Sequence, residues 1–241
     1  MLCGRLSRAM TDLSVQLNDG RVLPVSLRHH GRTRRLTARL DPRDDAVRVT
    51  APPRTRPADI QAFLDEHKDW VAAQLDKRGT RIALNPDTLL PIEGQDRRII
   101  ATGARRGLPV LTDGTLEVPG DPEHVPRRVL EFCKKRARST ILPLAEIKAA
   151  SILTRVKRVT VRDTTSRWGS CTNDGCLSFS WRLILAPPPV LDYVVAHEVA
   201  HLRHMDHSDK FWALNAQLTL AEMSEQRAWL RRHGSTLFRY G

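Results

Sequence analysis

The chain has 241 residues, and its 39 Lys and Arg against 27 Asp and Glu give a formal net charge of +12. This length allows one large domain or two small ones with a sizeable buried core. No apolar run approaches the roughly 20 residues that span a bilayer, so we expect no membrane partner. The N-terminus lacks the apolar segment of a signal peptide, and we therefore expect a cytoplasmic protein.

The N-terminal third of the chain predicts a β region followed by a helix. Residues 1–10 match no structural pattern, and we expect them to be a disordered extension, with Met1 or Met10 as the true start. Residues 11–80 then form a first region, in which alternating apolar residues predict an antiparallel β-meander. Apolar residues at helical spacing predict one helix over 57–78, with a Pro in its first turn and a Gly after its end. The expected strands lie within residues 13–17, 22–27, 35–40 and 47–50.

Residues 81–241 are predicted to form a second domain. Short strands are expected at 97–101, 115–118 and 156–161, and a long basic helix at 126–151, interrupted or kinked near Pro143. The Asn173-Asp174-Gly175 turn predicts a hairpin. Strands and helices are therefore mixed without a βαβ repeat, and the predicted fold class is α+β.

Two other features admit a functional and a structural interpretation. The densest basic cluster, which includes Arg127, Arg128 and Lys134 to Arg136, could attract nucleic acid, or it could be the solvated face of a helix. Cys171 and Cys176 could be half of a metal site or a redox pair, but no second close pair exists to complete a four-cysteine site. We favour two small residues at the end of a hairpin.

The pattern with the most chemical information is His197-Glu198-Val199-Ala200-His201. Residues four apart share one face of a helix, so the two imidazoles can bind one metal ion from consecutive turns. Glu198 then lies beside the ion, where a base can take a proton from a water molecule. An apolar stripe before the histidines predicts a helix from about Pro188 to His204.

A catalytic zinc site needs a third protein ligand, and His207 is the natural candidate. It stands ten residues after His197, just before Ser208, which can cap a new helix. Three neutral imidazoles leave a fourth position open for water, which is the catalytic arrangement. His204 lies two turns from His197 and is expected to be near the site or exposed rather than a ligand.

These residues resemble the YgjP-like metallopeptidase family, which is related to the SprT-like zincins. The resemblance is dense over residues 155–215 and looser over the N-terminal region. The motifs that carry it are Ser166 to Cys171, Trp181 to Leu183, Asp192 to Val195, His197 to Leu202, His207-Ser208 and Phe211-Trp212. The spacing of the histidines is also similar to that of metzincins, but those proteins usually have Gly where this chain has His204.

The resemblance implies a zincin-like domain in which the metal helix packs on a small sheet, with one catalytic zinc held by His197, His201 and His207 and with Glu198 as general base. It also implies that the strand at Arg167 to Ser170 lies next to the metal helix. A strand at the edge of a cleft can bind an extended peptide by strand addition, or Trp168 and Trp181 could simply pack against the metal helix. We favour packing for Trp181 and leave both interpretations open for Arg167 to Ser170. The expected function is hydrolysis of peptide bonds. The alternatives are a DNA-associated protease of SprT-like type and a zinc-binding hydrolase or binding module that is not a peptidase.

Overall fold

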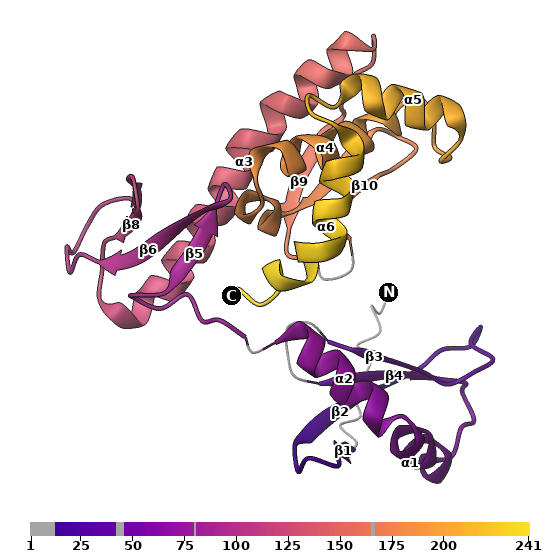
Figure 1. The fold of residues 1–241 in the computed structure, drawn as a ribbon. Coiled ribbons are helices and arrows are strands. Elements are labelled where there is room, and N and C mark those ends of the chain that lie inside the picture. Colours follow the sequence, from indigo (N-terminus) through magenta and orange to yellow (C-terminus); the bar gives the residue numbers. More distant parts are fainter. Residues whose placement is uncertain (1–12, 42–45, 80, 165–166) are drawn as a thin grey trace, which may run out of the picture. The chain divides into compact units, whose positions relative to one another are not determined.

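The computed structural model describes residues 13–41, 46–79, 81–164 and 167–241, so the expected extension at residues 1–10 lies outside the described part. The chain divides into two compact units, residues 1–80 and 81–241, each with its own hydrophobic core (Figure 1). The units contain three sheets and six α-helices among the described residues, which confirms the α+β class.

The first unit contains a four-stranded sheet in the order β1-β2-β4-β3. The inner strands β2 and β4 are parallel, with Val25 opposite Val47, while β1 and β3 pair antiparallel at the two edges. The prediction of a simple antiparallel meander is therefore wrong for the central pair. Alternation along a strand reports which side chains face the core, but it does not report which strand lies alongside. The strands are Ser14–Gln16 (β1), Val22–His29 (β2), Thr37–Leu40 (β3) and Val47–Ala51 (β4).

The helical part of the first unit consists of two helices, α1 (Pro57–Glu66) and α2 (Lys68–Arg78), where one was predicted. The break is at His67, whose ring Nδ1 lies 2.8 Å from the carbonyl oxygen of Phe63. In an uninterrupted helix the backbone N–H of His67 would bind that oxygen, but here it donates to Leu64 instead. The side chain has replaced one helical hydrogen bond, which the apolar spacing could not reveal.

The second unit is organised along one long helix, α3 (Val125–Ser151). Its buried residues recur every four positions from Val125 through Ala145 and form one continuous apolar face. The helix is not interrupted at Pro143, contrary to expectation. Pro143 lies on the exposed face, where water can satisfy the carbonyl that loses its N–H partner. Within the described residues, no helix is both long and apolar enough to cross a bilayer.

The N-terminal half of α3 is accompanied by a four-stranded sheet in the order β5-β6-β8-β7 (Figure 1). A short 3-10 helix, η1 (Pro122–His124), leads into α3. The strands are Leu89–Ile92 (β5), Gln95–Ala101 (β6), Val110–Leu111 (β7) and Thr115–Val118 (β8).

The C-terminal half of α3 packs against β9 and α4, and a three-stranded sheet has the order β10-β11-β9. The expected hairpin is confirmed, since β10 pairs antiparallel with β11. Two helices, α5 and α6, follow α4. The elements are Arg158–Arg162 (β9), Gly169–Cys171 (β10), Cys176–Ser180 (β11), the 3-10 helix Trp181–Leu185 (η2), Pro188–Ala200 (α4), Asp209–Leu218 (α5) and Met223–Leu237 (α6).

Helix α4 is buried on nearly every side. It contacts α3, η2, β10, α5 and α6, and from Val190 to Ala200 only His197 is more than slightly exposed. The apolar residues of this helix each contribute roughly 1.5–3 kcal/mol when they are fully buried. This helix is therefore held from several directions, and its side chains have little freedom to move.

A buried ion pair ties α4 to α3. Lys148 Nζ lies 2.7 Å from Asp192 Oδ1, with only 6% and 7% of the two side chains exposed. The ammonium also donates to the carbonyl of Leu218, while Asp192 Oδ2 accepts from the backbone N–H of Leu220. These contacts fix the segment between α5 and α6 to both helices.

We predict that Lys148→Met lowers the free energy of unfolding by about 3–5 kcal/mol, because it leaves the Asp192 carboxylate buried without its cation. The matched control is Arg127→Met, which removes an ion pair with Glu131 whose side chains are 65% and 60% exposed. That change should cost less than about 1 kcal/mol. Urea unfolding followed by tryptophan fluorescence measures both, since all tryptophans except Trp70 lie in the second unit. Equal effects of the two substitutions would contradict a stabilising role for the buried pair.

Candidate active site

His197 and His201 lie at the C-terminal end of α4. The helix ends at Ala200 rather than near His204, and His201 occupies the cap position with helical backbone angles. The two imidazole centroids are 5.0 Å apart. The early end of the helix does not separate the histidines, because the cap residue still follows the helical path.

His207 comes from the loop between α4 and α5 and faces the other two histidines. Its Nε2 lies 3.3 Å from Nε2 of His197, and its ring centroid lies 4.8 Å from that of His201. One nitrogen from each of the three rings lies within 4.8 Å of the others. The structure thus brings together the three residues that the sequence proposed as metal ligands.

His204 contributes its backbone rather than its side chain. The Nδ1 of His201 lies 2.9 Å from the carbonyl oxygen of His204. A carbonyl only accepts, so Nδ1 carries the proton and Nε2 of His201 presents a lone pair. The loop after α4 therefore selects the tautomer that a metal ligand needs.

Two residues of helix α5 contact the histidine rings. Phe211 is fully buried and stacks on the ring of His201, with centroids 4.5 Å apart. Asn215, one turn further along and also fully buried, places its amide 3.4 Å from Nδ1 of His197. These two residues restrict the rotation of the imidazoles around their side-chain bonds.

Burial favours the neutral form of His197 and His201. Burial, followed by the proximity of His201 and His207, lowers the pKa of His197 to about 4. Burial also lowers the pKa of His201. Neutral imidazoles are the form that binds a metal. Two nitrogens bound to one tetrahedral zinc at 2.0–2.1 Å would lie roughly 3.3–3.4 Å apart, which agrees with the observed 3.3 Å between His197 and His207. The donor set therefore fits a zinc ion.

Glu198 lies beside this cluster and is only 6% exposed. Burial raises the pKa of its carboxyl to about 7, and nearby Arg167 opposes that rise. Its side chain lies directly against the backbone of Gly169. A Cβ atom added to Gly169 would stand 2.5 Å from both Cγ and Oε1 of Glu198. Only glycine leaves enough space for the carboxylate at this point of β10.

Strand β10 forms one side of a cavity of about 260 Å³ that contains the histidines and Glu198. It lies at the edge of its sheet, with β11 as its strand partner. The cavity is lined by Arg167, Gly169, Ser170, Cys171, His197, Glu198, His201, Met205 and His207.

The two tryptophans considered at the sequence level have different environments. Trp181 is fully buried in the core of the second unit, where η2 contacts α4, as expected. Trp168 instead packs on the C-terminal segment, with its ring 4.8 Å from that of Phe238 and its edge against Gly234. Packing of Trp168 was one of two alternatives left open, and the ring packs against α6 and the segment that follows it.

The two cysteines occupy the ends of the hairpin strands. Cys171 is the last residue of β10 and Cys176 the first of β11, and neither forms a disulfide. Burial raises the pKa of the Cys171 thiol to about 11, which keeps it protonated. Within the described residues, the only group suited to hold a metal is the histidine cluster.

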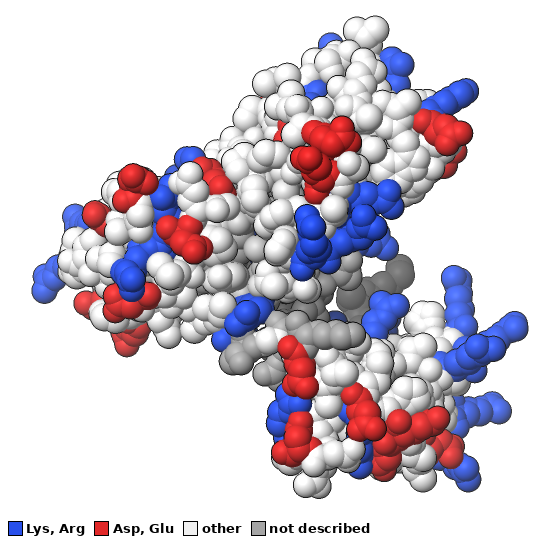
Figure 2. Space-filling model, viewed as in Figure 1, with Lys and Arg blue, Asp and Glu red and all other residues white. Residues whose placement is uncertain are grey.

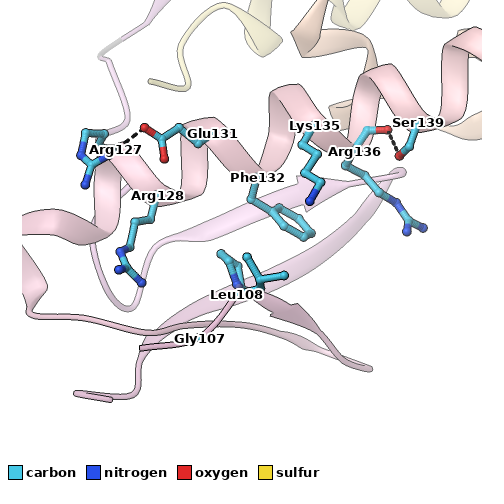
Figure 3. Close-up of a pocket in the computed structure, with 10 residues that line it drawn as sticks. Gly107, Leu108, Arg127, Arg128, Glu131, Phe132, Lys135, Arg136 and Ser139 are labelled. Atoms are coloured by element: carbon cyan, nitrogen blue, oxygen red, sulfur yellow. Dashed lines mark hydrogen bonds and ion pairs between the residues drawn. The ribbon is translucent and has the colours of Figure 1, made fainter. Parts of the chain in front are cut away.

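The basic cluster predicted on the long helix borders a second cavity, of about 460 Å³, beside α3. Figure 2 shows acidic and basic side chains interspersed around this part of the unit, and in Figure 3 Phe132 faces Leu108 across the cavity. Local partners occupy most of the arginines. Arg127 pairs with Glu131, Arg136 with Glu93, and Arg128 and Arg138 donate to backbone carbonyls.

Several residues of the site were not identified from the sequence. Gly169 contacts Glu198. Phe211 and Asn215 contact the rings of His201 and His197. Each of these contacts joins separate segments of the chain. Asp192 carried a usable signal, since a carboxylate within the apolar stripe of α4 requires a buried partner. Lys148 lies on the apolar face of α3, so the sequence also contained the buried cation that pairs with Asp192.

The sequence matches the family profile described as YgjP-like, metallopeptidase domain, over residues 36–233. No curated protein matches the chain. Among solved structures, the metallopeptidase zymogen abylysin of Pyrococcus abyssi is 19% identical, and the alignment covers 38% of this chain and 93% of that one with a TM-score of 0.29. That similarity is too low to bear on the fold. The family match extends over most of the chain and includes the whole histidine cluster, so the chain belongs to the YgjP-like family and is a zinc metallopeptidase.

Proposed function

We propose that this chain hydrolyses peptide bonds at one zinc ion per chain, held by His197, His201 and His207, with Glu198 as general base. The observation that carries the proposal is the convergence of three imidazole nitrogens within 4.8 Å, next to a buried carboxylate in the same cavity. A zinc ion at such a site supplies a Lewis acid that polarises the scissile carbonyl and lowers the pKa of the attacking water.

Residues of the chain would carry out the proton transfers and hold the base in position. Glu198 accepts a proton from the attacking water on its carboxylate and later donates it to the leaving amine. Its burial supports this role, because a carboxyl with a pKa near neutrality can both accept and release a proton at physiological pH. Gly169 has no Cβ atom, and this allows the carboxylate of Glu198 to lie directly against the backbone of β10.

We propose further that the substrate lies along β10. This strand pairs with β11 on one side, and Gly169, Ser170 and Cys171 line the cavity that holds the histidines. An extended peptide added at this edge would form backbone hydrogen bonds that do not depend on its sequence. Its scissile carbonyl would then lie beside the histidine cluster.

We predict that the purified protein binds about one zinc per chain and that His207→Ala loses or weakens it, because only two imidazoles remain. Metal analysis after dialysis measures the stoichiometry. His204→Ala is the matched control, since His204 contributes a backbone carbonyl that alanine retains. A His207→Ala protein with undiminished zinc affinity would remove His207 from the ligand set.

We predict that Glu198→Gln keeps its zinc but loses activity by a factor on the order of 10²–10⁴, as expected when a general base is removed. The measurement is kcat on a fluorogenic peptide library, with zinc content determined on the same samples. Hydrolysis at the wild-type rate would show that Glu198 is not the base.

We predict that Gly169→Ala lowers kcat by about tenfold or more while zinc binding and folding are retained. The new methyl group forces the flexible Glu198 side chain to move, and a displacement of about 1 Å from the productive geometry is enough for a large loss. Gly31→Ala is the control, because a Cβ atom there meets open space. Unchanged kcat in Gly169→Ala would contradict a positioning role for this glycine.

A further inference from the structure

Three arginines border the candidate active site without having been assigned a role. Arg167 stands two residues before β10 and lines the cavity that contains Glu198 and the histidines. Arg227 and Arg231 come from α6, which contacts α4. All three side chains are exposed to solvent, so a bound substrate could reach them.

The geometry of α6 places its arginines beside the histidines. The guanidinium of Arg227 lies over the ring of Trp212 at 5.0 Å, and that ring lies 5.6 Å from the ring of His207 and 5.9 Å from that of His197. Trp212 therefore connects the start of α6 to the metal ligands.

The same face of α6 continues along the cleft toward β10. Residues 227, 231 and 234 follow the spacing of one helical face. Gly234 packs against Trp168, where an added Cβ would stand 3.1 Å from the indole. Arg231 therefore lies on a face that extends from Trp212 at one end to Trp168, the neighbour of Arg167, at the other. Figure 2 shows a group of Lys and Arg side chains over α6.

The positive charge of these arginines is not neutralised locally. Within the described part of the chain, none of the three forms an ion pair, in contrast to Arg127 and Arg136 on α3. Glu198 is the acidic residue that shares the cavity with Arg167, and it is buried against Gly169. A substrate that enters this cleft meets a positive rim with free guanidinium groups.

We propose that this cleft selects peptides that carry Asp or Glu side chains around the scissile bond, with Arg167, Arg227 and Arg231 as the specificity-determining residues. Guanidinium groups bind carboxylates through two parallel hydrogen bonds, which gives direction as well as attraction. Lys and Arg side chains at the same substrate positions are repelled. The inference rests on the proposed peptidase function and specifies its substrate class.

The test uses the zinc-loaded full-length protein and three peptides that share one neutral scaffold and differ only in having Glu, Gln or Lys at the positions flanking the cleaved bond. We expect kcat/KM to fall in the order Glu, Gln, Lys, with about a tenfold ratio between Glu and Lys at low salt, as a few exposed ion pairs would give. Because salt screens exposed charges, the ratio should shrink toward one at about 1 M salt.

Charge reversal at α6 provides the decisive variant. Arg227→Glu with Arg231→Glu should invert the preference, while Arg105→Glu with Arg106→Glu, the same charge reversal at two exposed arginines between β6 and β7, should leave it unchanged. Equal kcat/KM for the Glu and Lys peptides in the wild type, or a Glu preference that survives the reversal, would overturn the proposal.

A binding measurement separates this proposal from the peptidase proposal. Zinc-loaded Glu198→Gln should bind the Glu peptide about tenfold more tightly than the Lys peptide by fluorescence anisotropy. Preferential binding without any cleavage by the wild type would leave the acidic specificity standing and contradict the peptidase function. Cleavage of the Glu and Lys peptides with equal kcat/KM would support the peptidase function and contradict the acidic specificity.

Discussion

The burial of α4 is the constraint on which the rest of the site depends. Apolar residues on almost every side of this helix pack against α3, β10, η2, α5 and α6, so its axis and rotation are fixed by several neighbours at once. A metal site requires its ligands to be held within a fraction of an ångström. Burial of one helix end, with His197 and His201 lining a single cavity, restrains both side chains in the way that such a site needs.

The same burial determines the chemistry of Glu198. A carboxylate in water would have an ordinary pKa, but the close backbone of β10 and the surrounding helices remove solvent and raise the pKa to about 7. A divalent cation at the three imidazoles would act in the opposite direction and favour the ionised form. The protonation of Glu198 would therefore differ between the metal-free and the metal-bound protein.

The second unit brings to the site residues from its whole length. Lys148 in the middle of the chain anchors α4 through Asp192, and Arg227 of α6 lies over the ring of Trp212, which is 5.6 Å from the ring of His207. The family match begins at residue 36 and thus includes β3, β4 and both helices of the first unit, but not β1 or β2. Part of the first unit, which has its own core, therefore falls within the family match, although the histidine cluster lies wholly in the second unit.

The sequence by itself determined the features that depend on local spacing. Two histidines four residues apart on an apolar helix share one face wherever that helix packs, and alternating residues located most strands. Tertiary structure alone decided the features that depend on distant segments: the parallel pairing of β2 with β4, the packing of Trp168 against α6 and the approach of Gly169 to Glu198. Periodicity reports that a residue will be buried, but it does not report the neighbour that buries it. The path of the backbone decides which glycine must make room for a carboxylate and which arginines surround a cleft.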